Sequence, residues 1–201
     1  MTLYDIKPAF QDLLRPACNT LARVGITANQ VTLAALALSV ATGIALLLLR
    51  EERWVLLLVP AALLVRMALN AIDGMLAREH HMQSALGGLL NELGDVISDI
   101  ALYVPFGLVA GVSPVAVNAA VVLAVLSEMT GVVAVQIGAS RRYDGPMGKS
   151  DRAFAFGLLA TVLGFGLEAG GWTDACLVII ATLTAVTVVN RARAALAELD
   201  P

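Results

Sequence analysis

Six long apolar segments constrain the fold of this chain more than any other feature. We place them at residues 30–49, 54–78, 85–111, 114–138, 153–169 and 174–193. A helix needs about 20 predominantly apolar residues to cross the hydrocarbon core of a bilayer, and most of these segments have that length. The sequence therefore predicts an all-α membrane protein, with a six-span bundle over residues 30–193 in a single domain of residues 1–201.

Composition supports the same class. The chain has 201 residues, of which 59% are hydrophobic and 14% charged. A soluble globular domain has about 45–50% apolar and about 25% charged residues, so both values favour an integral membrane protein. The net charge of −3 excludes a strongly basic nucleic-acid-binding protein. Membrane lipids are expected partners, and nucleic acid is not.

Residues 3–23 precede the first apolar segment and carry apolar side chains at roughly helical spacing. This pattern predicts an amphipathic juxtamembrane helix that lies at the membrane surface. Pro8 and Pro16 are unfavourable inside a helix, so a frayed tail is the alternative. The first ten residues lack a basic stretch followed by an apolar core, so no signal peptide is expected.

The two cysteines and two histidines show no metal-binding pattern. Cys18 precedes the first apolar segment and Cys176 lies in the last, so we expect small apolar fillers and no disulfide. His80 and His81 are adjacent and would point to different sides of a helix, so we interpret them as loop residues.

The stretch from Asn70 to Asp99 places polar residues beside apolar segments, where ionisable groups are costly and indicate a functional site by default. Two sets of residues share helix faces: Asn70, Asp73, Gly74 and Ala77 at i, i+3, i+4 and i+7, and Asn91, Asp95 and Asp99 at i, i+4 and i+8. The glycines at positions 87, 88 and 94 would let a second helix approach closely.

Two antiparallel helices with this spacing would surround one gap with four oxygen-bearing side chains, those of Asn70, Asp73, Asn91 and Asp95. Hard divalent cations prefer carboxylate and amide oxygens, and phosphoryl transfer needs positive charge against the phosphates. Gly74 and Ala77 leave room for a base or a sugar, and Arg78 is placed to meet a phosphate.

This pattern resembles the signature of the CDP-alcohol phosphotransferase family, D-x2-D-G-x2-A-R followed after about eight residues by G-x3-D-x3-D. The positions that agree are Asp73, Gly74, Ala77, Arg78, Gly87 and Asp95. Asn70 and Asn91 stand where the family has its first and third aspartates. A weaker likeness extends over the whole chain, through six apolar segments in the family's order.

The resemblance implies a transferase that moves a substituted phosphate from a CDP-alcohol, with CDP-diacylglycerol as the expected lipid donor, to an acceptor alcohol with release of CMP. It implies divalent ions, Mg²⁺ or Mn²⁺, on the CDP diphosphate. It assigns Asp73 to metal and nucleotide, and Asp95 to metal and to the base that deprotonates the acceptor. Because Asn70 and Asn91 supply only neutral oxygens, a weaker or single-metal site is expected. A homodimer is also implied.

Two further segments resemble family features. Asn29 and Thr32 match an N-x-x-T that faces the nucleotide in many members, although capping and backbone bonding are the alternative, with Thr27 as the expected helix cap. Residues 140–152 are the most polar stretch and contain a G-K turn similar to the family's. Lys149 and Arg152 are expected to bind a phosphorylated acceptor or the lipid phosphate, with positive-inside anchoring as the alternative.

Three charged residues lie deeper in the apolar segments. Arg66 precedes Asn70 by one turn and Asp99 follows Asp95 by one turn, so both lie about 6 Å deeper than the motif. We expect them to form a buried ion pair beneath the site, because an unpaired charge there would be costly. The alternatives are Arg66 turned to Glu128, or Asp99 bonded to hydroxyls such as Ser98 or to a neighbouring helix. Glu128 itself either lines the acceptor pocket or bonds to a neighbouring span.

Positive residues set the expected orientation. With six spans, ten Lys and Arg residues share the side of both termini and of the turns at 79–84 and 139–152, whereas Arg50 and Arg53 lie on the other side. The positive-inside rule then places both termini and the active site in the cytoplasm, at an inner or cell membrane.

Two other functions stay open. The two Asn residues motivate a catalytically weakened paralogue that binds nucleotide or lipid as a regulator or scaffold. Charges inside a membrane also mark ion paths, so a small transporter is the second alternative. The D-G-x2-A-R signature argues against transport.

Overall fold

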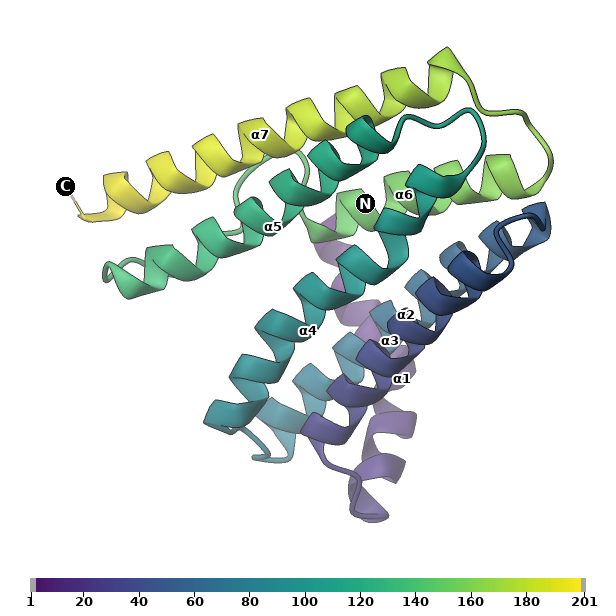
Figure 1. The fold of residues 1–201 in the computed structure, drawn as a ribbon. Helices are drawn as coiled ribbons and strands as arrows, with labels where there is room; N and C mark the ends of the chain where they lie inside the picture. Colours follow the sequence, from purple (N-terminus) through teal and green to yellow (C-terminus); the bar gives the residue numbers. More distant parts are fainter. Residues whose placement is uncertain (1–2, 200–201) are drawn as a thin grey trace. The chain divides into compact units, whose positions relative to one another are not determined.

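The computed structural model describes residues 3–199, and this part of the chain is all-helical, as predicted (Figure 1). Its elements are α1 (Leu3–Arg23), α2 (Ala28–Leu48), η1 (Arg53–Leu57), α3 (Leu58–Glu79), α4 (Ala85–Tyr103), η2 (Val104–Leu108), α5 (Pro114–Gln136), α6 (Lys149–Gly164) and α7 (Gly171–Leu199). Each of the six predicted segments overlaps one α-helix, from α2 to α7.

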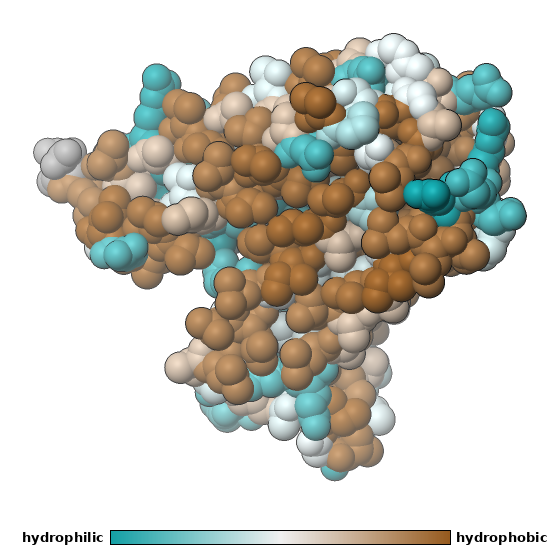
Figure 2. Space-filling view, viewed as in Figure 1, coloured by the Kyte–Doolittle hydropathy of each residue, from teal (hydrophilic) through white to brown (hydrophobic). Residues whose placement is uncertain are grey.

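Within residues 3–199, four stretches are long and apolar enough to cross a membrane: Ala28–Leu48, Arg53–Glu79, Pro114–Gln136 and Gly171–Leu199. Of the six helices in the predicted segments, α4 and α6 are not among these four stretches. The α4 helix carries Glu92, Asp95 and Asp99, and the α6 helix has only 16 residues. The six-span topology therefore stays a prediction. Apolar residues cover much of the surface seen in Figure 2. Leu48 and Val115 have exposed fractions of 77% and 78%, as expected for side chains that face lipid.

Several predicted helix boundaries were wrong. The third segment was expected to run to residue 111, but α4 ends at Tyr103 because Pro105 lacks an N–H and disfavours helical geometry in the residue before it. The fifth segment begins earlier than expected, at Lys149, where the Asp151 carboxylate accepts the backbone N–H of Gly148 at 2.9 Å. The last helix extends to Leu199, six residues beyond the end of the predicted segment at residue 193.

Helix caps agree with the sequence. The backbone N–H of Gln30 donates to the Thr27 hydroxyl at 3.3 Å, and the Gln30 side chain accepts the N–H of Thr27 at 2.9 Å, which is a reciprocal capping box. Ser113 caps α5 with Pro114 as its first residue.

The chain divides into two compact units, and the first contains residues up to Ala41 together with Ala61–Ser98. Its core joins α1, α2 and α3 through Cys18, Ala28, Val31, Ile72, Met75 and Leu76. The α1 helix continues through Pro16 and is tied to the end of α3 by an ion pair between Arg15 and Glu79. Residues 3–23 therefore form a helix, and the alternative of a frayed tail is wrong. The side chains of residues 3–8 lie outside the described part of the structure.

The second unit contains Thr42–Pro60 and the chain from Asp99 onward. Helices α5 and α7 lie side by side in it (Figure 1). Helix α6 packs on η1 and α7. The Tyr103 and Phe156 rings stack with centroids 4.0 Å apart. A Cβ added to Gly43 would lie 2.3 Å from the carbonyl oxygen of Ala101, so this glycine allows the two backbones to touch.

Candidate functional site

The first unit holds Asp73 by a bond between helices. The Thr32 hydroxyl on α2 donates to Asp73 Oδ2 on α3, with 2.8 Å between the oxygens. Both residues are buried, and the same hydroxyl lies 3.1 Å from the carbonyl oxygen of Ala28. Thr32 and Asp73, both predicted site residues, are thus in direct contact. Hydrogen bonds to a charged carboxylate are stronger than those between neutral groups.

Two side chains of α3, those of Arg66 and Asn70, form hydrogen bonds with Asp95. Arg66 Nη2 lies 3.2 Å from Asp95 Oδ1 and 3.1 Å from the Asp95 carbonyl oxygen, and the Asn70 amide nitrogen lies 3.4 Å from the same Oδ1. Arg66 is only 3% exposed. The structure therefore brings Asn70 and Asp95 together across α3 and α4, as the spacing predicted, whereas Asn91 is an exposed residue of α4.

Two glycines leave room for polar side chains. A Cβ added to Gly74 would lie 3.1 Å from both terminal nitrogens of Arg78, so the guanidinium lies over this glycine. A Cβ added to Gly87 would lie 2.7 Å from Asn29 Oδ1. The predicted close approach occurs at Gly87 but not at Gly88 or Gly94, where an added Cβ would meet nothing within 4 Å.

Ser84 is a polar residue of this region that sequence reasoning missed. Its hydroxyl accepts the backbone N–H of Gly87 at 2.9 Å and lies 3.4 Å from the Asn29 amide nitrogen. A serine directly before an apolar helix is a typical capping signal. The contact with Asn29, on α2, depends on the tertiary fold.

The donor set decides which metal could bind. Across residues 3–199, no three His, Cys, Asp or Glu side chains gather into a metal-binding group. Asp73 and Asp95 can supply two carboxylates, and Asn70 and Asn91 two amide oxygens. Such hard donors fit Mg²⁺ or Mn²⁺, but two negative charges suit one divalent ion rather than two.

The second unit surrounds Arg152 with acidic groups. Its Nη2 lies 3.1 Å from Asp99 Oδ2 and 3.0 Å from Glu128 Oε1, and its Nη1 donates to the Ser127 hydroxyl at 3.1 Å. Arg152 has no exposed surface, whereas Lys149, also at the start of α6, is half-buried.

Glu128 bonds to neighbouring helices, which is one of its two expected roles. Besides Arg152, it pairs with Arg141 at 3.3 Å and with Arg191 at 3.4 Å. Sequence reasoning missed Arg191, although an arginine within an otherwise apolar segment is a signal of this kind. Arg141 lies in the polar stretch of residues 140–152.

The predicted pair of Arg66 and Asp99 joins residues of different units and stays a prediction. Within the first unit Arg66 pairs with Asp95, and within the second Asp99 pairs with Arg152. Each of the two charges therefore has an oppositely charged partner. The partner of Arg66 is Asp95, one turn of α4 before Asp99, and the partner of Asp99 is Arg152 on α6.

The two histidines lie in the turn after α3, as expected, whereas of the two cysteines Cys18 is buried and Cys176 is exposed. A ring nitrogen of His80 lies 3.1 Å from Asn19 Oδ1, and His81 has a positive φ of 56° in the turn after α3. Both cysteines are free. Burial raises the pKa of the Cys18 thiol, which suits an unreactive residue of the core.

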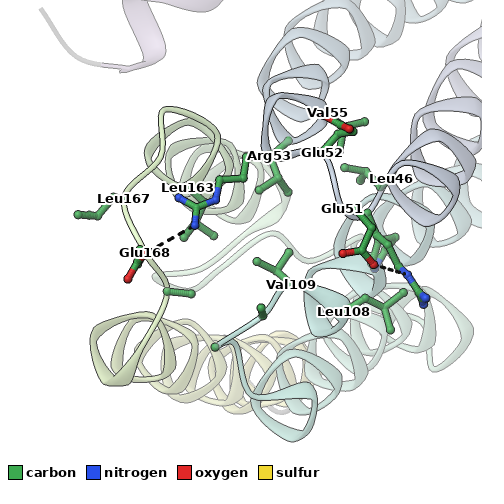
Figure 3. Close-up of a pocket in the computed structure, with 16 residues that line it drawn as sticks. Leu46, Glu51, Glu52, Arg53, Val55, Leu108, Val109, Leu163, Leu167 and Glu168 are labelled. Atoms are coloured by element: carbon green, nitrogen blue, oxygen red, sulfur yellow. Dashed lines mark hydrogen bonds and ion pairs between the residues drawn. The ribbon is translucent and has the colours of Figure 1, made fainter.

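A cavity of about 430 Å³ opens in the second unit (Figure 3). Turns at the ends of α2, η2 and α6 line it, with the Arg53–Glu168 and Arg50–Glu51 ion pairs at its edge. None of the predicted site residues lines this cavity, so it does not belong to the candidate site.

Comparisons with known proteins find similar proteins over most of this chain. The family model described as CDP-alcohol phosphatidyltransferase matches residues 25–193. The chain is 47% identical over 196 residues to the inner membrane protein YnbA of Escherichia coli (strain K12). The aligned region covers 98% of this chain and 97% of that protein.

Solved structures share the fold. A crystal structure of phosphatidylinositol phosphate synthase PgsA1 from Mycobacterium tuberculosis, with CDP-DAG bound, matches with a TM-score of 0.75 and 21% identity over 90% of this chain and 92% of that one. A second PgsA1 structure, in complex with manganese and citrate, matches with the same TM-score and identity over 90% and 88% of the two chains.

Proposed function

Because the chain belongs to the CDP-alcohol phosphatidyltransferase family, we propose that it transfers a substituted phosphate from CDP-diacylglycerol to an acceptor alcohol, with release of CMP, in phospholipid biosynthesis. The observation that carries the proposal is the position of Asp73 in the D-G-x2-A-R motif and of Asp95 in the G-x3-D-x3-D half of the signature. Thr32 is bonded to Asp73, and Arg66 and Asn70 are bonded to Asp95. PgsA1, with the same fold, has been crystallised with CDP-DAG.

In the proposed reaction the acceptor oxygen attacks the lipid-side phosphorus, its bond to the CMP oxygen breaks, and Asp95 takes the proton of the alcohol. Arg66 orients the Asp95 carboxylate by a charge-assisted hydrogen bond. Asn70, Asp73, Asn91 and Asp95 would hold one Mg²⁺ or Mn²⁺. When bound, such an ion supplies positive charge against the phosphates.

The nucleotide would bind where α2, α3 and α4 present small and polar groups in the first unit. Asn29 and Thr32 contribute from α2, Gly74, Ala77 and Arg78 from α3, and Gly87 from α4. The guanidinium of Arg78 lies over Gly74 and is exposed, which suits a contact with a phosphate. We assign Lys149 and Arg152 to the acceptor side of the reaction, where Lys149 supplies the accessible charge.

We also propose six spans, with both termini and the active site in the cytoplasm, and a homodimer in an inner or cell membrane. The relative YnbA is an inner membrane protein. Cysteine accessibility from each side of the membrane tests the topology, and cross-linking in native membranes tests the dimer. Cross-linking that yields monomer alone would contradict the dimer.

CMP release from CDP-diacylglycerol, in the presence of Mg²⁺ or Mn²⁺, tests the function. Acceptors to screen are glycerol phosphate, serine, inositol phosphate and phosphatidylglycerol. Release that depends on one acceptor supports the transferase. Binding of CDP-diacylglycerol without release under any condition supports instead the weakened paralogue, which Asn70 and Asn91 motivate. If the protein neither binds CDP-diacylglycerol nor releases CMP, transport becomes the function to test.

A further inference from the structure

Three arginines of the second unit converge on one carboxylate. Arg152 and Arg191 lie 3.0 and 3.4 Å from Glu128 Oε1, and Arg141 lies 3.3 Å from Oε2. Arg152 and Arg191 are 0% and 2% exposed, and Glu128 is 9% exposed. A single internal carboxylate is thus enclosed by guanidinium groups from α6, α7 and the segment before α6.

The backbone around this cluster is built to admit the guanidiniums. Gly131 follows Glu128 by one turn of α5, and a Cβ there would lie 1.6 Å from Arg141 Nη1. A larger residue at this position would therefore require the Arg141 guanidinium to move. At Gly145 a Cβ would lie 2.6 Å from the Thr187 Cα, so the segment that carries Arg141 is pressed onto α7.

The cluster has more donor capacity than its carboxylates use. Three arginines face two acids, Asp99 and Glu128, and the buried Nε atoms of Arg152 and Arg191 have no hydrogen-bond partner. A planar guanidinium binds phosphate as well as carboxylate, and a tetrahedral phosphate offers more oxygens than one carboxylate. This arrangement has the chemistry of a phosphate site in which the chain supplies its own anion.

We propose that Glu128 determines acceptor specificity by occupying the place that the phosphate of a phosphorylated acceptor would take among Arg141, Arg152 and Arg191. The acceptor is then an alcohol without a phosphate group, because the Glu128 carboxylate already occupies this place and would repel a second anion. The inference rests on the proposed function and names its substrate class. Asp99, which pairs with Arg152, follows the proposed base Asp95 by one turn of the same helix.

Matched acceptors test this on the unmodified protein. Glycerol is compared with glycerol phosphate, and inositol with inositol phosphate, as acceptors in CMP release from CDP-diacylglycerol. We expect the member without phosphate to be used at least about tenfold more efficiently in kcat/KM. A preference for the phosphorylated member of either pair would overturn the proposal.

A second measurement does not need turnover. Glu128→Gln keeps the shape of the side chain but removes its charge, so the variant should bind inorganic phosphate at least about tenfold more tightly than the unmodified protein, because its arginines lose a competing anion. Glu168→Gln, which makes the same change at an exposed residue, should leave phosphate binding unchanged. Equal phosphate affinity in the unmodified protein and the Glu128→Gln variant would overturn the proposal.

The outcomes separate this inference from the proposed function. Absence of CMP release with every acceptor would count against the transferase, and the phosphate-binding comparison would then still decide the role of Glu128. Where Glu128→Gln does not yield folded protein, the matched acceptors on the unmodified protein decide it. CMP release with a phosphorylated acceptor alone would support the transferase and overturn the inference.

Discussion

The hydroxyl of Thr32 on α2 and the carboxylate of Asp73 on α3 lie 2.8 Å apart, and both are buried. This bond joins the N-x-x-T segment to the D-G-x2-A-R motif, which are 41 residues apart in the sequence. The contact supports the proposal that both belong to one site, because the hydroxyl orients the carboxylate proposed to bind metal and nucleotide.

Thr32→Val removes this donor without changing the shape of the side chain. We expect a loss of about 1–3 kcal/mol in the free energy of unfolding, because a buried carboxylate loses a hydrogen bond. Denaturation in detergent micelles measures it. Thr32→Ser keeps a hydroxyl and should retain most of the stability; equal stability of the Val and Ser variants would contradict the role of the bond.

Asp95→Asn should lower the rate of CMP release by at least about 100-fold, because an amide cannot accept the proton of the alcohol. Steady-state kinetics with CDP-diacylglycerol measure the rate, and thermal unfolding checks that the variant folds. Glu92→Gln makes the same acid-to-amide change on α4 outside the motif and should keep the rate. An Asp95→Asn variant with undiminished turnover would remove Asp95 from the mechanism.

The double variant Asn70→Asp with Asn91→Asp should bind Mg²⁺ or Mn²⁺ more tightly. In the structure the Asn70 amide donates to Asp95, so a carboxylate there would repel Asp95 until a cation lies between them. We therefore expect a lower unfolding temperature without metal and a larger rise when metal is added, with about 2.7 kcal/mol of stabilisation at 100 times the Kd.

Thermal unfolding over a metal titration measures both effects. Gln83→Glu, an amide-to-acid change in the turn before α4, should leave the metal dependence as it is in the unmodified protein. A double variant that binds metal no better than the unmodified protein would rule out the view that the Asn residues weaken the site.

Asp144 should contribute to stability only above acidic pH. Hydrogen bonds from Arg142, at 2.9 and 3.0 Å, lower the pKa of the Asp144 carboxyl below its usual value. A group with a lowered folded pKa adds stability above its unfolded pKa, about 4 for aspartate, and that stability is lost as pH falls through the folded pKa.

Asp144→Asn should therefore lower the unfolding temperature slightly at pH 7, where the partly exposed pair is screened by solvent, and make no difference in strong acid. Unfolding temperatures measured from pH 7 to pH 3 test this. A difference between variant and unmodified protein that does not shrink with falling pH would contradict it.

Gly43→Ala should destabilise the second unit, because its Cβ would lie 2.3 Å from the backbone oxygen of Ala101 and force the helices apart. We expect a loss of about 1–3 kcal/mol, typical of overpacking. Gly88→Ala is the matched control: its Cβ meets nothing within 4 Å, and alanine favours a helix by up to about 1 kcal/mol. Equal losses in the two variants would show that the close contact at Gly43 is unimportant.

The sequence by itself determined the all-helical class, most helix starts and the family. These properties depend on local patterns: the apolar runs, the capping residues Thr27 and Ser113, and the spacing of Asn70, Asp73 and Asp95 along single helices. Helix ends were less predictable, since apolar composition continues past Tyr103 although Pro105 ends α4.

Only the tertiary structure decided which charges meet. The sequence places Arg66, Asp99 and Glu128 within apolar segments, where a charge needs a partner, but several oppositely charged residues could meet that requirement. The choice depends on how helices pack: Arg66 contacts Asp95, and Arg141 crosses Gly131 to reach Glu128. The three arginines around Glu128 come from positions 141, 152 and 191, so no local pattern could bring them together.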